Sequence, residues 1–369
     1  MCSSDLAREA TFPRLNHRRR TRFNSHDMKA VQLLAHGTPG QFRFGEVPDP
    51  KPAADEVIVR VRACGVNHLD LWFEQGDLPM PVALPRIGGC EVAGEIIALG
   101  ADVDQWRVGD RVAVQSNLFC GTCEFCLRGE DSICLNGKLL GVQCDGGFAE
   151  KVKVPARCVV ALPEAVSFET SAALTLAGST AMHMLTDRTE VRAGDWVLVI
   201  GASSGVGSAA VQIAKQLGGR VITTGSSAAK RELGFKLGAD YVVDSSKADW
   251  PAEVRKITDK RGVDLVVEHV GGVVLQSVFH CLARGGTVVT CGATGGREVP
   301  VQLWPFFVKQ HRLIGSYGRN RGDLNATLEW AADGRLKPVI HQLIPLPGVS
   351  NAFEQLRARQ VLGKLVVKP

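Results

Sequence analysis

The pattern of apolar and polar positions changes partway along the chain. Between residue 28 and about residue 162, short β-branched runs such as residues 56–61 and 111–114 are separated by proline and glycine. Such runs between turn residues are typical of β-strands. From about residue 167, helical patterns alternate with short apolar strands. The sequence therefore predicts an α/β protein, in which a mostly β domain precedes a doubly wound parallel sheet.

The second half of the chain predicts a regular series of elements. Helices are expected over residues 172–184, 205–217 and 324–332, and strands over residues 195–200, 220–224, 241–243, 263–267, 287–291 and 364–367. We expect four parts: a leader over residues 1–27, the β domain over 28–162, the parallel-sheet domain over 163–315, and a tail over 316–369. The tail is expected to return to the first domain and close a cleft between the two.

Composition narrows the class of protein. The chain has 369 residues, more than one hydrophobic core usually supports. Its net charge is +5, and part of that charge lies in the arginine-rich residues 1–27, which we predict to be a disordered leader or an upstream start. A transit peptide is the alternative for this segment, although it lacks a clear amphipathic helix. The near-neutral remainder argues against nucleic acid as a partner.

Neither a membrane span nor secretion is predicted. Residues 196–214 are uncharged, but their glycine and serine content fits a strand, a turn and a helix better than a span. Eleven cysteines in a long chain without a signal-peptide h-region fit a reducing compartment. We therefore expect a cytoplasmic protein that acts on a small molecule.

A glycine-rich segment follows the apolar strand that ends at residue 200. It reads Gly201, Ala202, Ser203, Ser204, Gly205, Val206 and Gly207, and an alanine-rich helix follows it. A dinucleotide pyrophosphate needs free backbone N–H groups at a helix N-terminus, and glycines allow the close approach. In this context the segment predicts dinucleotide binding, with Gly201, Ser203, Ser204, Gly205, Val206 and Gly207 as the contacting residues.

The end of the second strand of this unit favours NADP(H) over NAD. An acidic residue usually binds the ribose hydroxyls of NAD at this place, but the chain has Thr224, Gly225, Ser226 and Ser227, with Lys230 and Arg231 one turn later. Hydroxyls and cations are suitable donors to a 2′-phosphate, so Ser226 and Lys230 are the candidate contacts. The alternative is a serine helix cap with solvated charges.

Cysteines gather at metal-binding spacing in a lobe that we place at residues 118–136. Cys120, Cys123, Cys126 and Cys134 follow the pattern C-x2-C-x2-C-x7-C. Four thiolates complete a tetrahedral zinc shell and leave no position for water, so one structural Zn²⁺ is predicted. Glu124 and Asp131 are interpreted as solvated loop charges.

Several segments resemble the medium-chain dehydrogenase/reductase superfamily, which includes zinc alcohol dehydrogenases and quinone oxidoreductases. They are residues 65–70, 88–94, 108–112 and 146–150, in the family's order. The resemblance implies a Rossmann domain with a GroES-like catalytic domain. It also implies that Thr180 lies near the nicotinamide, that Cys291, Gly292 and Ala293 face its carboxamide, that Lys364 approaches the cofactor, and that a homodimer forms near residues 313–317.

The family's alcohol dehydrogenases hold a second, catalytic zinc, and this chain departs from their ligand set. The corresponding positions are Asn67, Cys90 and Leu176, and only the neighbouring Glu91 is kept. Leucine has no lone pair and a neutral amide is a poor zinc ligand. A rearranged site that uses His68, Asp70, Cys90 and Glu91 is the alternative.

These observations predict an NADPH-dependent reductase of quinones, enones or enoyl thioesters that acts without catalytic zinc. Asn67 would donate a hydrogen bond, His68 and Asp70 would supply an acid or a proton relay, and Tyr317 is a further candidate acid. Each of Asn67, His68 and Asp70 also has a purely structural interpretation. The alternative functions are a zinc alcohol dehydrogenase with a rearranged site and a non-catalytic, nucleotide-binding redox sensor.

Overall fold

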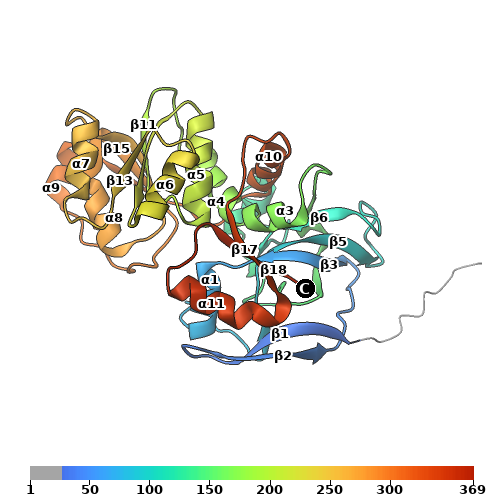
Figure 1. The fold of residues 1–369 in the computed structure, drawn as a ribbon. Coiled ribbons are helices and arrows are strands. Elements are labelled where there is room, and N and C mark those ends of the chain that lie inside the picture. Colours follow the sequence, from blue (N-terminus) through green and yellow to red (C-terminus); the bar gives the residue numbers. More distant parts are fainter. Residues whose placement is uncertain (1–26) are drawn as a thin grey trace, which may run out of the picture.

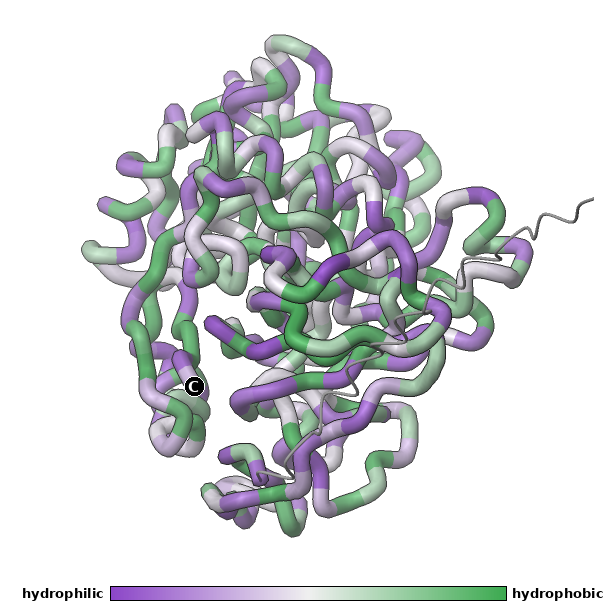
Figure 2. The backbone as a smooth tube through the Cα atoms, turned by 90° about the vertical axis from the view of Figure 1, so that its right-hand side faces the viewer, coloured by the Kyte–Doolittle hydropathy of each residue, from purple (hydrophilic) through white to green (hydrophobic). Residues whose placement is uncertain are grey.

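The computed structural model describes residues 27–369, so the expected leader over residues 1–27 lies outside the described residues except for Asp27. Two lobes lie side by side (Figure 1). Short hydrophobic stretches alternate with hydrophilic ones along most of the chain (Figure 2), and the buried hydrophobic residues form separate core clusters in the two lobes.

The first lobe is built on two antiparallel-rich sheets. Three strands pair in the order β2-β1-β4, and six lie in the order β10-β6-β5-β3-β18-β17, with β9 paired to β3. Their bounds are β1 Met28–Ala35, β2 Gln41–Val47, β3 Glu56–Gly65, β4 Arg86–Ile87, β5 Glu91–Leu99, β6 Arg111–Val114, β9 Lys151–Pro155, β10 Val159–Ala161, β17 Ile340–Pro345 and β18 Lys364–Lys368. Helix α1 (His68–Gln75) packs against α11 (Val349–Arg357).

The second lobe is a six-stranded parallel sheet in the order β13-β12-β11-β14-β15-β16. Its strands are β11 Trp196–Val199, β12 Arg220–Gly225, β13 Tyr241–Asp244, β14 Val263–Glu268, β15 Leu282–Thr290 and β16 Arg312–Gly315. Its helices are α5 Gly205–Gln216, α6 Ala228–Lys236, α7 Trp250–Ile257, α8 Gly272–Val278 and α9 Leu303–Val308. The strand order reverses between β11 and β14, which is where open α/β sheets bind ligands.

The tail of the chain rejoins the first lobe. Helix α10 (Arg321–Ala332) packs on α4 (Ala177–Met182), and β18 then pairs antiparallel with β3 and parallel with β17. A buried strand at the very end of the chain is therefore part of the central sheet of the first lobe.

One predicted helix is wrong in its continuity. The segment expected as one helix over residues 172–184 is two helices, α3 (Phe168–Leu174) and α4, followed by a π-helical turn at His183–Asp187. The cause is Glu91, whose carboxylate accepts hydrogen bonds from the backbone N–H groups of Leu176 (2.6 Å) and Ala177 (3.0 Å). A buried acid thus caps a second helix at a point where the helical pattern of the sequence continues without a break.

Among residues 27–369, none of the helices has both the length and the apolar character that a membrane span needs.

Candidate active site and zinc lobe

The four cysteine sulfurs of the lobe lie at zinc-binding separations. Cys120 Sγ is 3.9 Å from Cys126 Sγ, which is 3.5 Å from Cys123 Sγ. Cys123 Sγ lies 3.8 Å from Cys134 Sγ. A tetrahedral zinc with Zn–S bonds of about 2.3 Å requires separations of about 3.8 Å. The donor set and its geometry therefore fit one zinc ion with a closed shell.

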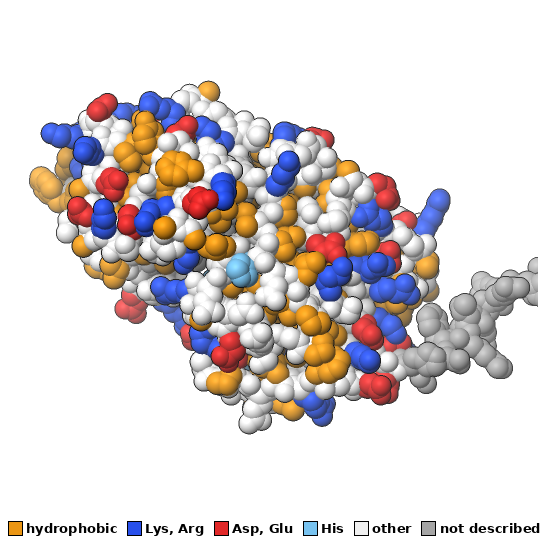
Figure 3. All heavy atoms as spheres, viewed as in Figure 1, with side chains coloured by type: hydrophobic (Ala, Val, Ile, Leu, Met, Phe, Trp, Pro, Cys, Tyr) orange, Lys and Arg blue, Asp and Glu red, His pale blue; other side chains and the backbone are white. Residues whose placement is uncertain are grey.

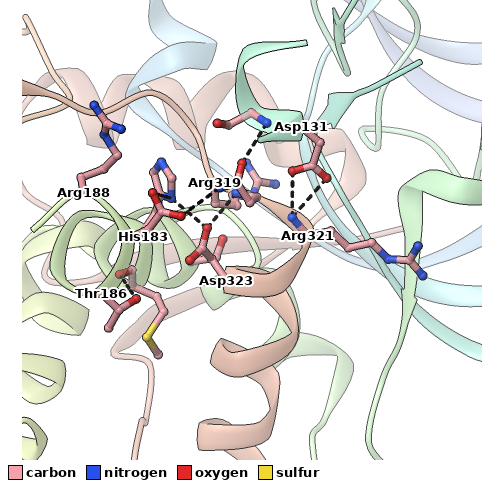
Figure 4. A network of polar contacts seen from close by, with 12 residues as sticks. Asp131, His183, Thr186, Arg188, Arg319, Arg321 and Asp323 are labelled. Carbon is pink, nitrogen blue, oxygen red and sulfur yellow. Dashed lines mark hydrogen bonds and ion pairs between the residues drawn. The ribbon is translucent and has the colours of Figure 1, made fainter. Parts of the chain in front are cut away.

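The lobe is also anchored to the tail of the chain. Asp131 is buried, and its carboxylate accepts from the backbone N–H of Arg321 at 3.0 and 3.2 Å, at the start of α10 (Figure 4). Ser132 N–H donates to Asn320 Oδ1 at 3.1 Å. Burial raises the pKa of Asp131 to about 6, against the lowering effect of these backbone hydrogen bonds. The interpretation of Asp131 as a solvated loop charge was therefore wrong, because this acid joins the zinc lobe to a helix.

The glycine segment forms a tight turn in front of α5 that requires glycine at two of its positions. Gly201 has φ +65°, and a Cβ on Gly207 would lie 2.1 Å from the Gly201 carbonyl oxygen. Ser204 caps α5 by accepting from the Gly207 N–H at 2.8 Å. Ser203 accepts from the Gly363 N–H at 2.7 Å, and Val206 packs into the core. Such a turn at a helix N-terminus fits a dinucleotide pyrophosphate.

The region after β12 carries cations and no acid at residues 225–227. Ser226 and Ser227 are exposed, and Ser227 caps α6 by accepting from the Lys230 N–H. The cap interpretation therefore applies to Ser227, whereas Ser226 and the Lys230 side chain stay available. Lys230 Nζ lies 3.4 Å from the carbonyl oxygen of Arg359, a residue that sequence reasoning missed.

Asn67, Glu91 and Lys364 form a buried ion cluster between the lobes. Lys364 Nζ donates to Val66 O at 2.7 Å and to Asn67 Oδ1 at 2.6 Å, and lies 2.7 Å from Glu91 Oε2. Asn67 Nδ2 donates to the same Glu91 oxygen at 3.0 Å. Glu91 is 0% exposed and Lys364 is 5% exposed. All three N–H bonds of the ammonium therefore have partners.

Lys364 lies beside the glycine turn, and its role towards the cofactor stays a prediction. Its aliphatic part lies against the glycine turn, since a Cβ on Gly205 would be 2.6 Å from Lys364 Cδ. Its charged end turns away into the ion cluster. Asn67 lies in that cluster at the N-terminus of α1. Its side-chain amide donates to Glu91 through Nδ2 and accepts from Lys364 through Oδ1.

Cys90 lies next to this cluster and is buried, 1% exposed. Burial raises the pKa of its thiol, with the charges of Asp70 and Glu91 acting in the same direction. Among residues 27–369, no three of His68, Asp70, Cys90 and Glu91 bring donor atoms within 4.8 Å of one another. The structure therefore does not bring together the donor atoms that the rearranged metal site would need.

His68 and Asp70 both lie in the first turn of α1. The residue His68 reaches the surface, but its imidazole loses part of its hydration there; this loss, followed by the charges of His269, Lys364 and Arg359, lowers its pKa to about 4. It is therefore a neutral imidazole near pH 7. Asp70 is buried and accepts from the Asn67 N–H at 2.7 Å, and burial raises its pKa to about 7. Asp70 thus acts as a helix cap.

The remaining predicted residues lie at the C-terminal edge of the parallel sheet or face it. Thr180 is buried in α4. Cys291, Gly292 and Ala293 follow β15, and a Cβ on Gly292 would be 2.1 Å from His269 O. Tyr317 is 54% exposed. Loss of hydration raises the pKa of its hydroxyl, the charge of Arg319 opposes this rise, and Cys90 adds to it.

Sequence reasoning missed His269, which supports the glycine turn. Its Nε2 lies 2.8 Å from Ile200 O and 3.1 Å from Ser204 Oγ. A polar residue directly after the fourth strand of the sheet was the available signal, because strand ends line this edge.

A second polar network joins α4 to α10. His183 Nδ1 lies 2.8 Å from Asp323 Oδ2, which also accepts from the Asn320 N–H at 2.8 Å (Figure 4). Asn320 Nδ2 donates to Asp187 at 3.1 Å. The network therefore fixes the loop between β16 and α10 against the cofactor lobe.

Comparisons with known proteins agree with this fold. The model of the family "Alcohol dehydrogenase GroES-like domain" matches residues 53–164, and that of "Zinc-binding dehydrogenase" matches residues 205–333. An alcohol dehydrogenase of Geobacillus stearothermophilus is 34% identical over 92% of this chain and 99% of its own. An acryloyl-coenzyme A reductase of Sulfurisphaera tokodaii is 32% identical over 93% of this chain and 100% of its own. A solved structure titled as an NAD-dependent alcohol dehydrogenase has a TM-score of 0.89 and 38% identity, covering 93% of this chain and 100% of its own.

Replacement of one lobe cysteine should remove the structural zinc. In Cys126→Ser we expect the zinc content to fall well below the roughly one ion per chain that a closed thiolate shell holds, and the melting temperature to drop. Elemental analysis and thermal unfolding measure both. Cys144→Ser, outside the lobe, is the control and should keep its zinc. Full zinc content in Cys126→Ser would contradict the ligand assignment.

Removal of the buried ammonium should destabilise the fold. Lys364→Met leaves Glu91 buried without its partner, for which we expect a loss of about 3–5 kcal/mol of unfolding free energy. The control is Lys368→Met on the same strand, whose partner Glu169 lies at the surface and whose loss should cost below about 1 kcal/mol. Denaturant unfolding measures the unfolding free energy of both variants. Equal losses would show that the buried cluster stabilises the fold no more than the surface ion pair does.

Proposed function

We propose the function from one premise: the chain belongs to the medium-chain dehydrogenase/reductase superfamily and is an oxidoreductase of that family. Within it, we propose that the chain is an NADPH-dependent reductase of quinones, enones or enoyl thioesters that uses no catalytic zinc. The single observation that carries this proposal is the buried Lys364 ammonium, which is bound by Asn67 and Glu91 beside Cys90.

The chemistry of the donors supports reduction without a catalytic metal. Two of the three positions that hold catalytic zinc in the family's alcohol dehydrogenases are Asn67 and Leu176 here, and neither is a useful zinc ligand. The Glu91 carboxylate that remains is neutralised by Lys364 and by the N-terminus of α4. A divalent cation would compete with the ammonium for the same oxygens.

The charges after β12 support NADPH. Lys230 lies there, with its Nζ donating to the backbone carbonyl oxygen of Arg359 at 3.4 Å, and Arg231 is paired with the Asp244 carboxylate at 3.0 Å. The Lys230 ammonium favours a dianionic 2′-phosphate, and residues 225–227 offer no carboxylate to bind the ribose diol of NAD. A structural relative carries NAD in its title, so the cofactor choice is a property to be tested on this chain.

The residues of this chain can carry out the steps that the reaction needs. The turn from Gly201 to Gly207 binds the pyrophosphate, and Thr180 and the turn at Gly292 orient the nicotinamide. When bound, the cofactor supplies the hydride. Neutral His68 relays a proton at the mouth of the site, and Tyr317 is the candidate donor at the acceptor.

A zinc alcohol dehydrogenase is the second candidate, because two similar proteins bear alcohol dehydrogenase names. It requires the donors near Cys90 to rearrange around a metal and Lys364 to leave its three partners. The acryloyl-coenzyme A reductase name of another relative agrees with the leading candidate.

We also propose that the protein is a cytoplasmic homodimer that pairs through β16. This strand is the last of the parallel sheet and pairs only with β15 in the described part of the chain, so its outer edge offers free backbone groups. Hydrophobic side chains stand out at the left end of the molecule (Figure 3), where α9 lies in Figure 1. They include Trp304, 74% exposed, and Leu303, Phe307 and Leu313.

Turnover with a defined panel tests the proposed function. We expect the purified protein to oxidise NADPH steadily with cyclohex-2-enone, crotonyl thioesters or 1,4-benzoquinone, and to keep that activity in a chelator that leaves the zinc lobe intact. The absorbance of NADPH measures the rate. Oxidation of primary or secondary alcohols that stops on chelation would favour the second candidate instead, and NADPH binding without any turnover would favour a sensor.

Charge reversal at Lys230 should affect NADPH selectively. In Lys230→Glu we expect kcat/KM for NADPH to fall by about 10- to 150-fold, the equivalent of a charged hydrogen bond of about 1.5–3 kcal/mol, with little change for NADH. Lys256→Glu, on α7, is the control for net charge. A higher kcat/KM for NADH than for NADPH in the unmodified protein would refute the assignment of Ser226 and Lys230.

A charge on the exposed apolar surface should separate the subunits. We expect Trp304→Asp to have the mass of a monomer by light scattering where the unmodified protein has that of a dimer, since a desolvated carboxylate is costly at an apolar interface. Val108→Asp, at a position 64% exposed in the other lobe, should stay dimeric. A monomeric unmodified protein would contradict the proposal.

A further inference from the structure

Buried polar atoms without partners are concentrated at one place between the lobes. Among residues 27–369, eight buried side-chain nitrogen or oxygen atoms have no hydrogen-bond partner, and four of them belong to Gln115, Ser316 and Arg319. These four are Gln115 Oε1, Ser316 Oγ, Arg319 Nε and Arg319 Nη2. Native proteins leave few such groups unsatisfied, so a cluster of them calls for a ligand.

Arg319 is the charged member of this cluster and is 0% exposed. Its Nη1 donates to Ser116 Oγ at 2.6 Å, and its backbone oxygen accepts from Gln115 Nε2 at 2.9 Å. Burial lowers its pKa, and the nearby acidic groups, of which Cys90 and Glu91 act most strongly, only oppose that effect. None of the described carboxylates forms a salt bridge with it. Two guanidinium N–H groups are thus held in place without an acceptor, at a cost in stability.

Arg319 lies where the two lobes meet. Its loop leaves the C-terminal edge of the parallel sheet, where Ser316 N–H donates to Thr290 O at 2.8 Å. Its side chain meets Ser116, which follows β6 of the other lobe. Tyr317, on the same loop, is exposed. The unpartnered nitrogens of Arg319 therefore lie at the junction of the two lobes, on the loop that carries Tyr317.

We propose that Arg319 is a catalytic residue whose Nε and Nη2 groups bind the carbonyl oxygen of an α,β-unsaturated acceptor. This inference rests on the proposed function. The bound cofactor would supply a hydride from C4 of its nicotinamide, and that C–H bond would break to leave NADP⁺. A C–H bond would form at the β-carbon of the acceptor, the C=C pair would shift to the bond between the α-carbon and the carbonyl carbon, and the C=O π pair would move to oxygen. The resulting enolate oxygen is stabilised by Arg319, which keeps its proton. The α-carbon then takes a proton from solvent by way of Tyr317, and the C=O bond reforms.

A guanidinium suits this task in a chain that lacks catalytic-zinc ligands. It stays charged when buried, and its planar fork offers parallel donors to one oxygen or to a carboxylate. Fixed donors in a dry site that face a developing oxyanion are among the largest single contributions to catalysis.

Three variants separate a catalytic from a structural role. With cyclohex-2-enone and NADPH, Arg319→Met should lower kcat by about 10²–10³-fold, while the NADPH dissociation constant, measured by cofactor fluorescence, stays the same. Arg319→Lys keeps the charge but not the fork and should lose activity to a smaller extent. Arg86→Met, which removes another arginine with an unpartnered Nε away from the cleft, is the matched control and should keep full kcat.

The melting temperature of Arg319→Met distinguishes a structural role from a catalytic one. If Arg319 only supported the fold, Arg319→Met would lower the melting temperature. If Arg319 is needed for catalysis and not for the fold, replacing its buried charge by an apolar side chain should leave the melting temperature equal or higher. An unchanged kcat in Arg319→Met, or a loss of kcat explained entirely by unfolding, overturns the proposal.

An anionic analogue tests the site without turnover. The complex with NADP⁺ should bind 4-nitrophenol as its phenolate, followed by visible absorbance, and Arg319→Met and Arg319→Lys should each bind it at least about tenfold more weakly. Equal binding in all three proteins overturns the proposal. If the unmodified protein reduces no enone but binds the phenolate through Arg319, the proposed function fails and the oxyanion site stands. If the unmodified protein and Arg319→Met reduce enones equally, the proposed function stands and this inference fails.

Discussion

The buried pair of Lys364 and Glu91 is the interaction on which the rest of the active region depends. It joins the last strand of the chain to the start of β5, and Asn67 at the head of α1 completes it. The same Glu91 carboxylate caps α4, which begins directly after the break at Leu176. A charge this deep is stable only when every partner is present. One cluster therefore orients the helix that carries His68, the helix that carries Thr180 and the lysine that packs on the glycine turn.

The zinc lobe is part of the same framework. Its buried Asp131 binds the N-terminus of α10, and the neighbouring Asp323 pairs with His183 on the cofactor lobe. Arg319 lies on the loop that precedes α10, between these contacts. The structural metal site thus helps to hold, at a distance, the loop that presents Tyr317 and Arg319 to the cleft.

Much of this could be predicted from the sequence, because local chemistry determined it. The cysteine spacing, the glycine turn after an apolar strand and the missing ribose acid after β12 each depend on neighbouring residues. What could not be predicted depends on residues far apart in the chain. The break between α3 and α4 is caused by Glu91, 85 positions away from Leu176. The burial of Asp131 depends on Arg321, 190 positions away, and the fully satisfied ammonium of Lys364 depends on partners almost 300 positions away. Arg319 was missed because only the fold shows that its nitrogens lack partners.

The central claim is that a lysine ammonium, and not a metal ion, is the cation held beside Cys90. Anomalous diffraction from crystals of the NADPH complex, recorded at the zinc absorption edge, tests it most directly. The account predicts one peak per chain, enclosed by Cys120, Cys123, Cys126 and Cys134, and continuous density from Lys364 to Glu91. A second peak bonded to Cys90, with Lys364 displaced from Asn67, would contradict it.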